Sequence, residues 1–172
     1  MSIARVALAA LLCASGAIAQ NAPLATTRVE IAGAVKRSLS LTVADLRALA
    51  TRRGGAVRAA AVSGNLPPQY RGYAGVRLAD VLDEAGIRRD ERNALRRTYV
   101  VARASDGYQA VFSWSELYNS ALGAGVLVVY ERDGSPLDEG EGAIALVSLA
   151  DERVGPRHVK WLKRVEVRRV PE

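Results

Sequence analysis

The stretch Asp151-Glu-Arg-Val-Gly-Pro-Arg-His-Val-Lys-Trp161 separates two runs, 143–149 and 165–169, whose composition is typical of buried strands. Gly155-Pro156 predicts that the connection between them turns sharply. The connection contains the only histidine of the chain and one of its two tryptophans. Its arginines offer planar donor forks for phosphate or carboxylate, its tryptophan offers a stacking face, and its aspartate, Asp151, can accept hydrogen bonds from an amino-heterocycle. The stretch therefore indicates a ligand-binding loop, with a solvated loop around a buried tryptophan as the alternative.

The rest of the chain alternates between strand-like and helix-like patterns. Strands are predicted at 28–31, 38–41, 56–62, 98–102, 109–112, 126–130, 143–149 and 165–169. Helices are predicted at 42–50, 77–85 and 113–118, and one or two further helical turns at 88–95. The dipeptide Asp106-Gly107 predicts a hairpin turn between two of the strands. Because there is no repeat and no linker, we expect an α+β fold (mixed α/β), a single compact domain with a mixed sheet and short helices.

The first nineteen residues have the pattern of a signal peptide. Arg5 supplies a positive charge, residues 6–13 are apolar, and Ala17-Ile-Ala19 forms a small-x-small cleavage site before Gln20. The apolar run is too short to span a bilayer. We therefore expect an exported, periplasmic protein with a signal peptide at 1–19, a flexible mature N-terminus at 20–27 and a folded domain at 28–172, without direct membrane insertion.

Composition excludes several classes of site. The only cysteine, Cys13, lies in the expected signal peptide, so the mature chain would have no thiolate ligand and no cysteine nucleophile. One histidine is too few for a His-rich metal site. The 24 basic and 18 acidic side chains give a net charge of +6, and the basic residues are spread along the chain. Export argues against nucleic acid as a partner, so we interpret the charge as anion steering, partner contact or solubility.

Several motifs occur in a characteristic order between Ala32 and Val167: Leu41-Thr-Val-Ala-Asp-Leu46, Tyr73-Ala-Gly-Val-Arg-Leu-Ala-Asp-Val-Leu82, Asp106-Gly-Tyr108, Asp133-Gly-Ser-Pro-Leu137 and His158-Val-Lys-Trp-Leu162. Their order and spacing resemble the molybdopterin-binding domain of the sulfite oxidase superfamily. The resemblance covers nearly the whole expected mature chain and implies the fold of that domain.

The chain departs from the resembling enzymes at one position. Their catalytic members have a metal-binding cysteine shortly before the aromatic-x-Gly-Val motif, where this chain reads Arg58-Ala-Ala-Ala-Val-Ser-Gly-Asn65. A serine hydroxyl is a harder ligand than a thiolate and stays protonated, so Ser63 is a poor substitute. The resemblance thus implies a pterin pocket without the metal chemistry, and we expect no enzymatic activity and no catalytic or metal-binding residues.

Small exported members of this superfamily that lack the cysteine are the nearest resembling group. The resemblance implies a protein that needs no cofactor and binds a reduced pterin such as a tetrahydropterin. It also implies a relay of pterin occupancy to the periplasmic sensor domain of an inner-membrane GGDEF/EAL-type protein that makes or degrades cyclic di-GMP. The alternatives are a molybdopterin-dependent oxidoreductase with atypical, non-cysteine metal ligation, and a structural adaptor with a degenerate pocket.

The residues predicted to contact the pterin fall on the loop described first, on polar or aromatic positions elsewhere, and on the former metal side. They are Asp151, Arg153, Arg157, His158, Trp161, Glu116, Tyr108, Trp114, Tyr73, Ser63 and Asn65. Other roles remain open for some of them. Asp151 is the pterin-edge acceptor or an ion-pair partner of Arg153, and Trp161 stacks on the ligand or belongs to the core. Glu116 either lines the pocket or caps a helix. The remaining aromatic residues either contact the ligand or pack in the core.

Overall fold

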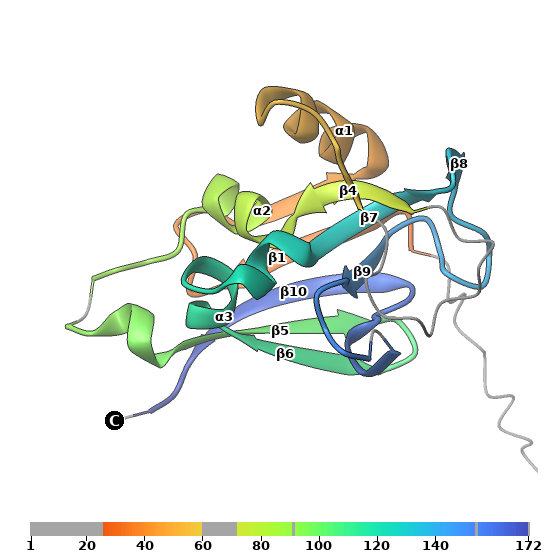
Figure 1. The fold of residues 1–172 in the computed structure, drawn as a ribbon. Coiled ribbons are helices and arrows are strands. Elements are labelled where there is room, and N and C mark those ends of the chain that lie inside the picture. Colours follow the sequence, from red (N-terminus) through yellow and green to blue (C-terminus); the bar gives the residue numbers. More distant parts are fainter. Residues whose placement is uncertain (1–25, 60–71, 91, 154, 172) are drawn as a thin grey trace, which may run out of the picture.

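Short strands and helices follow one another in the computed structural model, which describes residues 26–59, 72–90, 92–153 and 155–171 (Figure 1). The strands are β1 (Arg28–Gly33), β2 (Leu39–Thr42), β3 (Val57–Ala59), β4 (Tyr73–Arg77), β5 (Thr98–Ala104), β6 (Gln109–Ser113), β7 (Val126–Arg132), β8 (Ser135–Pro136), β9 (Ala145–Ser148) and β10 (Leu162–Arg169). The helices are α1 (Val43–Arg52), α2 (Leu78–Ala85) and α3 (Trp114–Tyr118), with 3-10 turns η1 (Ala94–Arg97), η2 (Ala121–Gly125) and η3 (Gly155–Arg157).

The strands form two mixed or antiparallel sheets. The first has the order β2-β1-β10-β5-β6, in which β1 and β10 pair in parallel and all other neighbours are antiparallel. In the second, β4 and β7 lie at the centre, flanked by β3, β8 and β9. Figure 1 shows β4 and β7 above β10, β5 and β6, so the two sheets lie as layers. The predicted α+β fold, with a mixed sheet and short helices, is confirmed.

The main core lies between the two sheets because alternate residues of both point inward. Val29 and Ile31 of β1 are fully buried, whereas their neighbours in the strand are partly or fully exposed. Val126 and Val128 of β7 belong to the same cluster. This alternation has the period of two that a strand with one buried face requires. A smaller apolar cluster, which includes Leu127, Val129 and Val147, covers the other face of β7 and β9.

Local signals set the starts of α1 and α3 and the end of α2 where the sequence predicted them, whereas α1 continues to Arg52 instead of ending at Ala50. Thr42 caps α1 and Ser113 caps α3, each through a complete capping box with the acidic residue three positions later. Gly86 closes α2 with a φ of +70°, a conformation that glycine adopts at little cost. The buried faces of α1 and α2 pack on β4.

One expectation about secondary structure is wrong, and another is covered only in part by the described residues. A helical turn or two is predicted at 88–95, but among the described residues of this segment only 94 and 95 are helical, as the start of the 3-10 turn η1, because this arginine-rich segment offers few apolar residues to bury. The strand expected at 56–62 is described only as β3, since residues 60–71 lie outside the described residues. The expected signal peptide lies outside them as well. Within the described ranges, no helix has the length and apolar character needed to cross a membrane.

Candidate functional site

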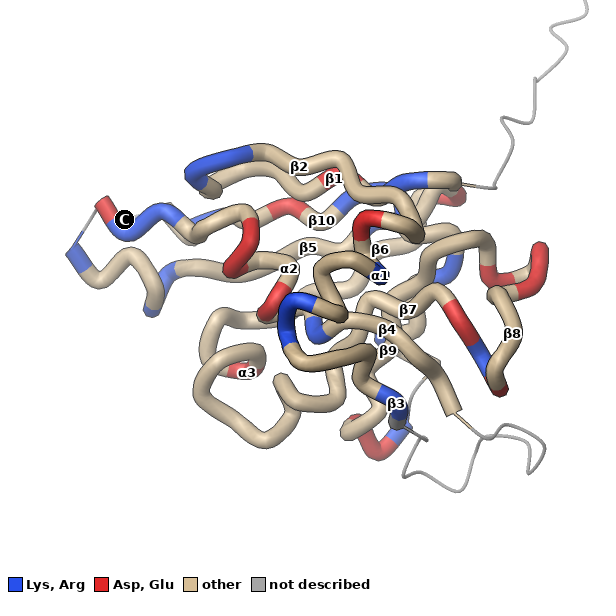
Figure 2. The backbone as a smooth tube through the Cα atoms, turned by 90° about the horizontal axis from the view of Figure 1, so that it is seen from above, with Lys and Arg blue, Asp and Glu red and all other residues tan. Residues whose placement is uncertain are grey.

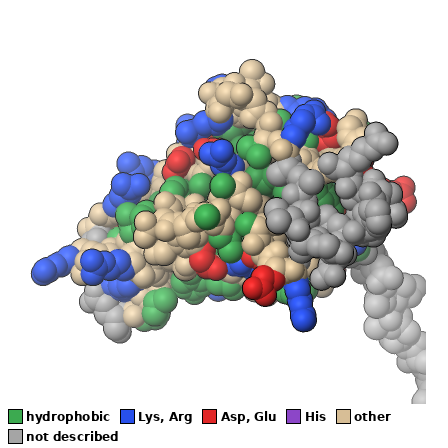
Figure 3. Space-filling view, in the orientation of Figure 1, with side chains coloured by type: hydrophobic (Ala, Val, Ile, Leu, Met, Phe, Trp, Pro, Cys, Tyr) green, Lys and Arg blue, Asp and Glu red, His purple; other side chains and the backbone are tan. Residues whose placement is uncertain are grey.

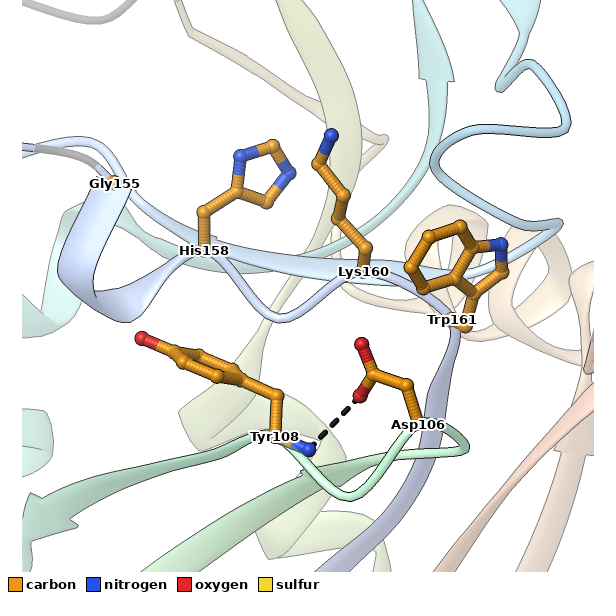
Figure 4. Close-up of a pocket in the computed structure, with 6 residues that line it drawn as sticks. All are labelled: Asp106, Tyr108, Gly155, His158, Lys160 and Trp161. Carbon is orange, nitrogen blue, oxygen red and sulfur yellow. Dashed lines mark hydrogen bonds between the residues drawn. The ribbon is translucent and has the colours of Figure 1, made fainter. Parts of the chain in front are cut away.

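The segment between η3 and β10 presents its polar side chains on one side. Val159 is fully buried and pairs with Leu146 through two backbone hydrogen bonds of 2.8 and 2.9 Å. His158 and Lys160 flank this residue, so in an extended segment their side chains lie on the opposite face from Val159. Figure 4 shows them side by side and followed by Trp161. The alternation therefore places His158 and Lys160 on one face, and Trp161 continues the row with a backbone conformation of its own.

A pocket of about 240 Å³ lies between this row and the β5–β6 turn. Its lining residues come from these two segments: Asp106, Tyr108, Gly155, His158, Lys160 and Trp161 (Figure 4). The turn is held in shape by a hydrogen bond from the Tyr108 amide to Asp106 Oδ1 at 2.8 Å. The Tyr108 hydroxyl donates to the carbonyl of Pro156 at 2.7 Å and so ties the turn to η3. The pocket has room for a small ring system and combines aromatic faces with charged groups of both signs.

Trp161 has an unusual backbone conformation at the end of this row. Its φ of +45° lies in the left-handed region, which bulky residues rarely adopt. Three hydrogen bonds hold it there: its amide donates to Glu141 O at 2.7 Å, its carbonyl accepts from the Ser105 amide at 3.0 Å, and its indole Nε1 donates to Glu139 O at 2.9 Å. Backbone strain of this kind is concentrated at binding sites, where it fixes the direction of a side chain.

Arg157 forms the centre of an ion cluster beside the pocket. It donates through Nε to Asp151 Oδ2 at 2.7 Å and through Nη2 to Asp151 Oδ1, while Nη1 donates to Glu116 Oε1 at 2.9 Å. Its guanidinium also lies over the ring of Phe112, 4.8 Å from the centroid. The hydrogen bonds with Asp151 raise the pKa of Arg157 against the effect of burial, and Glu116 adds to this.

The same cluster holds Glu116 ionised. Burial acts to raise the pKa of the Glu116 carboxyl, but the hydrogen bonds from the Ser113 amide and Arg157 outweigh it, so the pKa lies below its usual value. Glu116 is the third helical residue of the α3 capping box, which confirms the capping role considered for it. Asp151 is paired, but with Arg157 and not with Arg153, because η3 turns Arg157 back toward it.

Behind the pocket, a buried carboxylate holds His158. The Nε2 atom of His158 lies 2.6 Å from Glu141 Oε2, and Glu141 also accepts from Arg132 Nη1 at 3.2 Å. Lys160 Nζ lies 4.0 Å from Glu141 Oε1. On another side, the ring of Tyr73 meets the imidazole edge to face, with centroids 6.1 Å apart. The imidazole is thus held by a charged group and an aromatic ring before any ligand binds.

The structure brings together part of the predicted site. Tyr108, His158 and Trp161 line one pocket, and Asp151, Arg157 and Glu116 form the ion cluster beside it. The other predicted residues are placed as follows: Arg153 is exposed on the loop, Tyr73 is buried behind His158, and Trp114 stacks on Tyr118 against the main core. Ser63 and Asn65 lie outside the described residues.

Asp106, Lys160 and Glu141 were not among the predicted site residues. The alternation around Val159 places Lys160 on the same face as His158, and the Asp106-Gly107 pair predicts a hairpin turn but no ligand contact. Glu141 stands in a glycine-flanked turn that looks solvated in the sequence. Only its contacts with distant residues reveal its burial, so no local signal could have found it.

The distribution of charge does not single out the pocket. Figure 2 shows basic and acidic residues interspersed along the chain, and in Figure 3 basic side chains gather at the end that carries η1. Among the described residues, no three His, Cys, Asp or Glu side chains are grouped as metal ligands would be. The recognition groups of the pocket are instead its own lining side chains, which supply donors, a carboxylate and aromatic faces. These are the groups that recognise a polar heterocycle.

Comparisons with known proteins agree with the fold. The family described as the oxidoreductase molybdopterin binding domain matches residues 16–172. Mitochondrial sulfite oxidases of Macaca fascicularis and Rattus norvegicus are each 38% identical over 97 residues, which are 55% of this chain and 17% of the relative. The chain thus matches only a small part of their length. The sulfane dehydrogenase SoxCD of Paracoccus pantotrophus has a similar fold, with a TM-score of 0.54 and 21% identity, over 81% of this chain and 37% of that chain.

These matches confirm the resemblance found in the sequence, including the sulfite oxidase-like fold. They contradict the expectation that the chain is not an enzyme, because the matching family is one of oxidoreductases and the similar proteins are enzymes. The absence of a cysteine from the expected mature chain therefore does not exclude the chain from this family.

Proposed function

This chain belongs to the oxidoreductase molybdopterin-binding domain family, and we propose that it holds a molybdopterin-type pterin in the pocket between the β5–β6 turn and the segment before β10. The pocket itself carries the proposal. Trp161 and Tyr108 offer faces on which a flat heterocycle stacks. Lys160 offers a hydrogen-bond donor, His158 offers an imidazole nitrogen, and Asp106 offers an acceptor for the amino edge of a pterin.

The described residues fit the pterin part of molybdopterin better than its metal. Lys160 is half exposed and only 4.0 Å from Glu141, so its ammonium can reach an anionic group of a ligand while remaining tethered. The only cysteine of the sequence is Cys13, which lies outside the described residues, and no metal-ligand cluster occurs within them. When bound, a molybdenum cofactor supplies oxidation–reduction chemistry, and the residues of this chain bind and orient its pterin.

At the level of the family, we propose an oxidoreductase function. The alternative considered from the sequence, a molybdopterin-dependent oxidoreductase with non-cysteine ligation, is supported by the family and by the similarity to sulfite oxidase. Protein purified from its native host should contain pterin and molybdenum in stoichiometric amounts and should reduce an artificial electron acceptor in the presence of a substrate. If the purified protein contains pterin but no molybdenum, the oxidoreductase function is refuted and pterin binding remains.

Two substitutions test the pocket directly. Trp161→Ala removes the stacking face and Lys160→Ala removes a donor, and each should lower the affinity for tetrahydrobiopterin at least tenfold in anaerobic calorimetry. Lys163→Ala is the matched control, because Lys163 is an exposed lysine on β10 that does not line the pocket. Unchanged affinity in both pocket variants would refute the location of the site.

The relay of pterin occupancy to the periplasmic domain of a cyclic di-GMP enzyme remains a finer proposal, supported by the resemblance to small exported members of the superfamily. A pull-down with the sensor domain encoded beside this gene, in the presence and absence of tetrahydrobiopterin, tests it. The periplasmic location remains a proposal too. N-terminal sequencing of the protein from a periplasmic fraction should begin at Gln20.

A further inference from the structure

We infer that Glu141, which does not line the pocket, is the positioning residue that sets the orientation and the hydrogen-bonding state of His158. Its Oε2 atom lies 2.6 Å from His158 Nε2, within hydrogen-bond distance. Both partners are largely buried, with 5% of the Glu141 side chain and 13% of the His158 side chain exposed. Water therefore competes little for this hydrogen bond.

Arg132 makes the buried carboxylate tolerable. It donates to Glu141 Oε1 at 3.2 Å and to Asp138 Oδ2, and its own side chain is 18% exposed. A buried charge without such a partner would be strongly unfavourable. An ionised carboxylate only accepts hydrogen bonds, so the close nitrogen of His158 must donate. Glu141 thus requires a hydrogen on Nε2, and in the neutral imidazole this leaves Nδ1 as the acceptor.

The backbone keeps Glu141 in place. Its amide donates to Asp138 O at 3.0 Å and to Asp138 Oδ1 at 3.1 Å, and its carbonyl accepts from the Trp161 amide at 2.7 Å. The next residue, Gly142, packs so closely against Trp161 that an added Cβ would lie 2.7 Å from indole Cδ1. The turn at 138–142 therefore contacts two pocket residues. The Glu141 side chain binds His158, and the backbone of the turn binds Trp161.

This arrangement has a consequence for the ligand, which rests on the proposed function. If His158 faces a pterin with an unprotonated Nδ1, it accepts a hydrogen bond from the ligand, whereas the opposite tautomer would donate one. Groups that orient a metal-binding histidine usually change affinity or activity tenfold or more when they are removed, and we expect an effect of the same order for this imidazole. Glu141 would therefore select ligands that present a donor to this side of the pocket.

The tautomer is measured without any ligand. His158 is the only histidine of the chain, so the imidazole nitrogen signals in a long-range proton–nitrogen NMR spectrum belong to it alone. In the neutral ring we expect the wild type to carry its hydrogen on Nε2, and Glu141→Gln to populate both tautomers. A wild type with the hydrogen on Nδ1 overturns the proposal, even if the variant does not fold. An unchanged tautomer in a folded Glu141→Gln variant overturns it as well.

Binding is then measured with tetrahydrobiopterin by anaerobic calorimetry. We expect Glu141→Gln to bind about tenfold more weakly than the wild type. Glu139→Gln is the matched control, because it makes the same change on an exposed side chain of the same turn and should bind like the wild type. Equal affinities of all three proteins overturn the positioning role. A wild type that binds no pterin would refute the proposed function, whereas the nitrogen spectra would still test the role of Glu141.

Discussion

Replacing Arg157 with alanine should destabilise the fold far more than its place on a surface loop suggests. The substitution removes two hydrogen bonds to Asp151, one to Glu116 and the contact with the ring of Phe112. It leaves the carboxylate of Asp151, of which 11% of the side chain is exposed, without its cation. The loss therefore combines missing attraction with an uncompensated charge that is mostly buried.

The magnitude follows from the exposure of each partner. Removing one partner of a buried ion pair costs about 3–5 kcal/mol, whereas an exposed pair contributes about 1 kcal/mol or less. The pair with Asp151 is close to the buried case, and the pair with Glu116 is close to the exposed one because 39% of the Glu116 side chain is exposed. We expect a loss of about 3 kcal/mol, which lowers the Tm by roughly 6–12 °C in a domain of this size.

Urea unfolding followed by circular dichroism measures this loss. Arg153→Ala is the control, since Arg153 is exposed on the same loop and its removal should change the free energy of unfolding by about 0.5 kcal/mol or less. A double-mutant cycle with Asp151→Asn should show a coupling of about 1 kcal/mol or more. A loss below about 1 kcal/mol for Arg157→Ala, or no coupling, would refute the structural role of this ion pair. Arg157 and Asp151 would then be interpreted as ligand contacts.

Three further perturbations have defined outcomes. The pKa of Glu116 is lowered from its usual value of 4.5, so its contribution to stability is present above that pH and is lost as the pH falls through the lower, folded-state pKa; urea midpoints should show a weaker acid dependence in Glu116→Gln than in the wild type. Thr42→Ala removes the side-chain cap of α1 and should lower the free energy of unfolding by about 1 kcal/mol in calorimetry, and an unchanged value would contradict the cap. Gly142→Ala should cost about 2 kcal/mol and change the tryptophan fluorescence, because the new methyl group meets Trp161 and the φ of Gly142 is +81°; a wild-type spectrum and stability would contradict the close packing.

The features that the sequence predicted best are those whose signal is complete within a few residues. The Thr42–Asp45 and Ser113–Glu116 capping boxes and the Asp106-Gly107 turn each need only a four-residue window, and all form as predicted. The order of the motifs also predicted the family correctly, because it combines information from nearly the whole chain.

Contacts between distant residues could not be predicted in this way. The pairing of Asp151 with Arg157 depends on the direction in which η3 turns, and the burial of Glu141 depends on Arg132 and His158, which belong to other segments. An acid in a glycine-rich turn has the same local pattern whether it is solvated or buried. The binding site was therefore located at the level of the loop, but its supporting residues were not.

The parallel pairing of β1 with β10 also determines when the first sheet can form. β10 lies between β1 and β5, and Glu30 of β1 faces Arg164 of β10 across more than a hundred residues of chain. The hairpins β1–β2 and β5–β6 therefore cannot join into this sheet until β10 pairs between them. Before it does, each hairpin exposes an unpaired strand edge, which is a template for pairing with another chain.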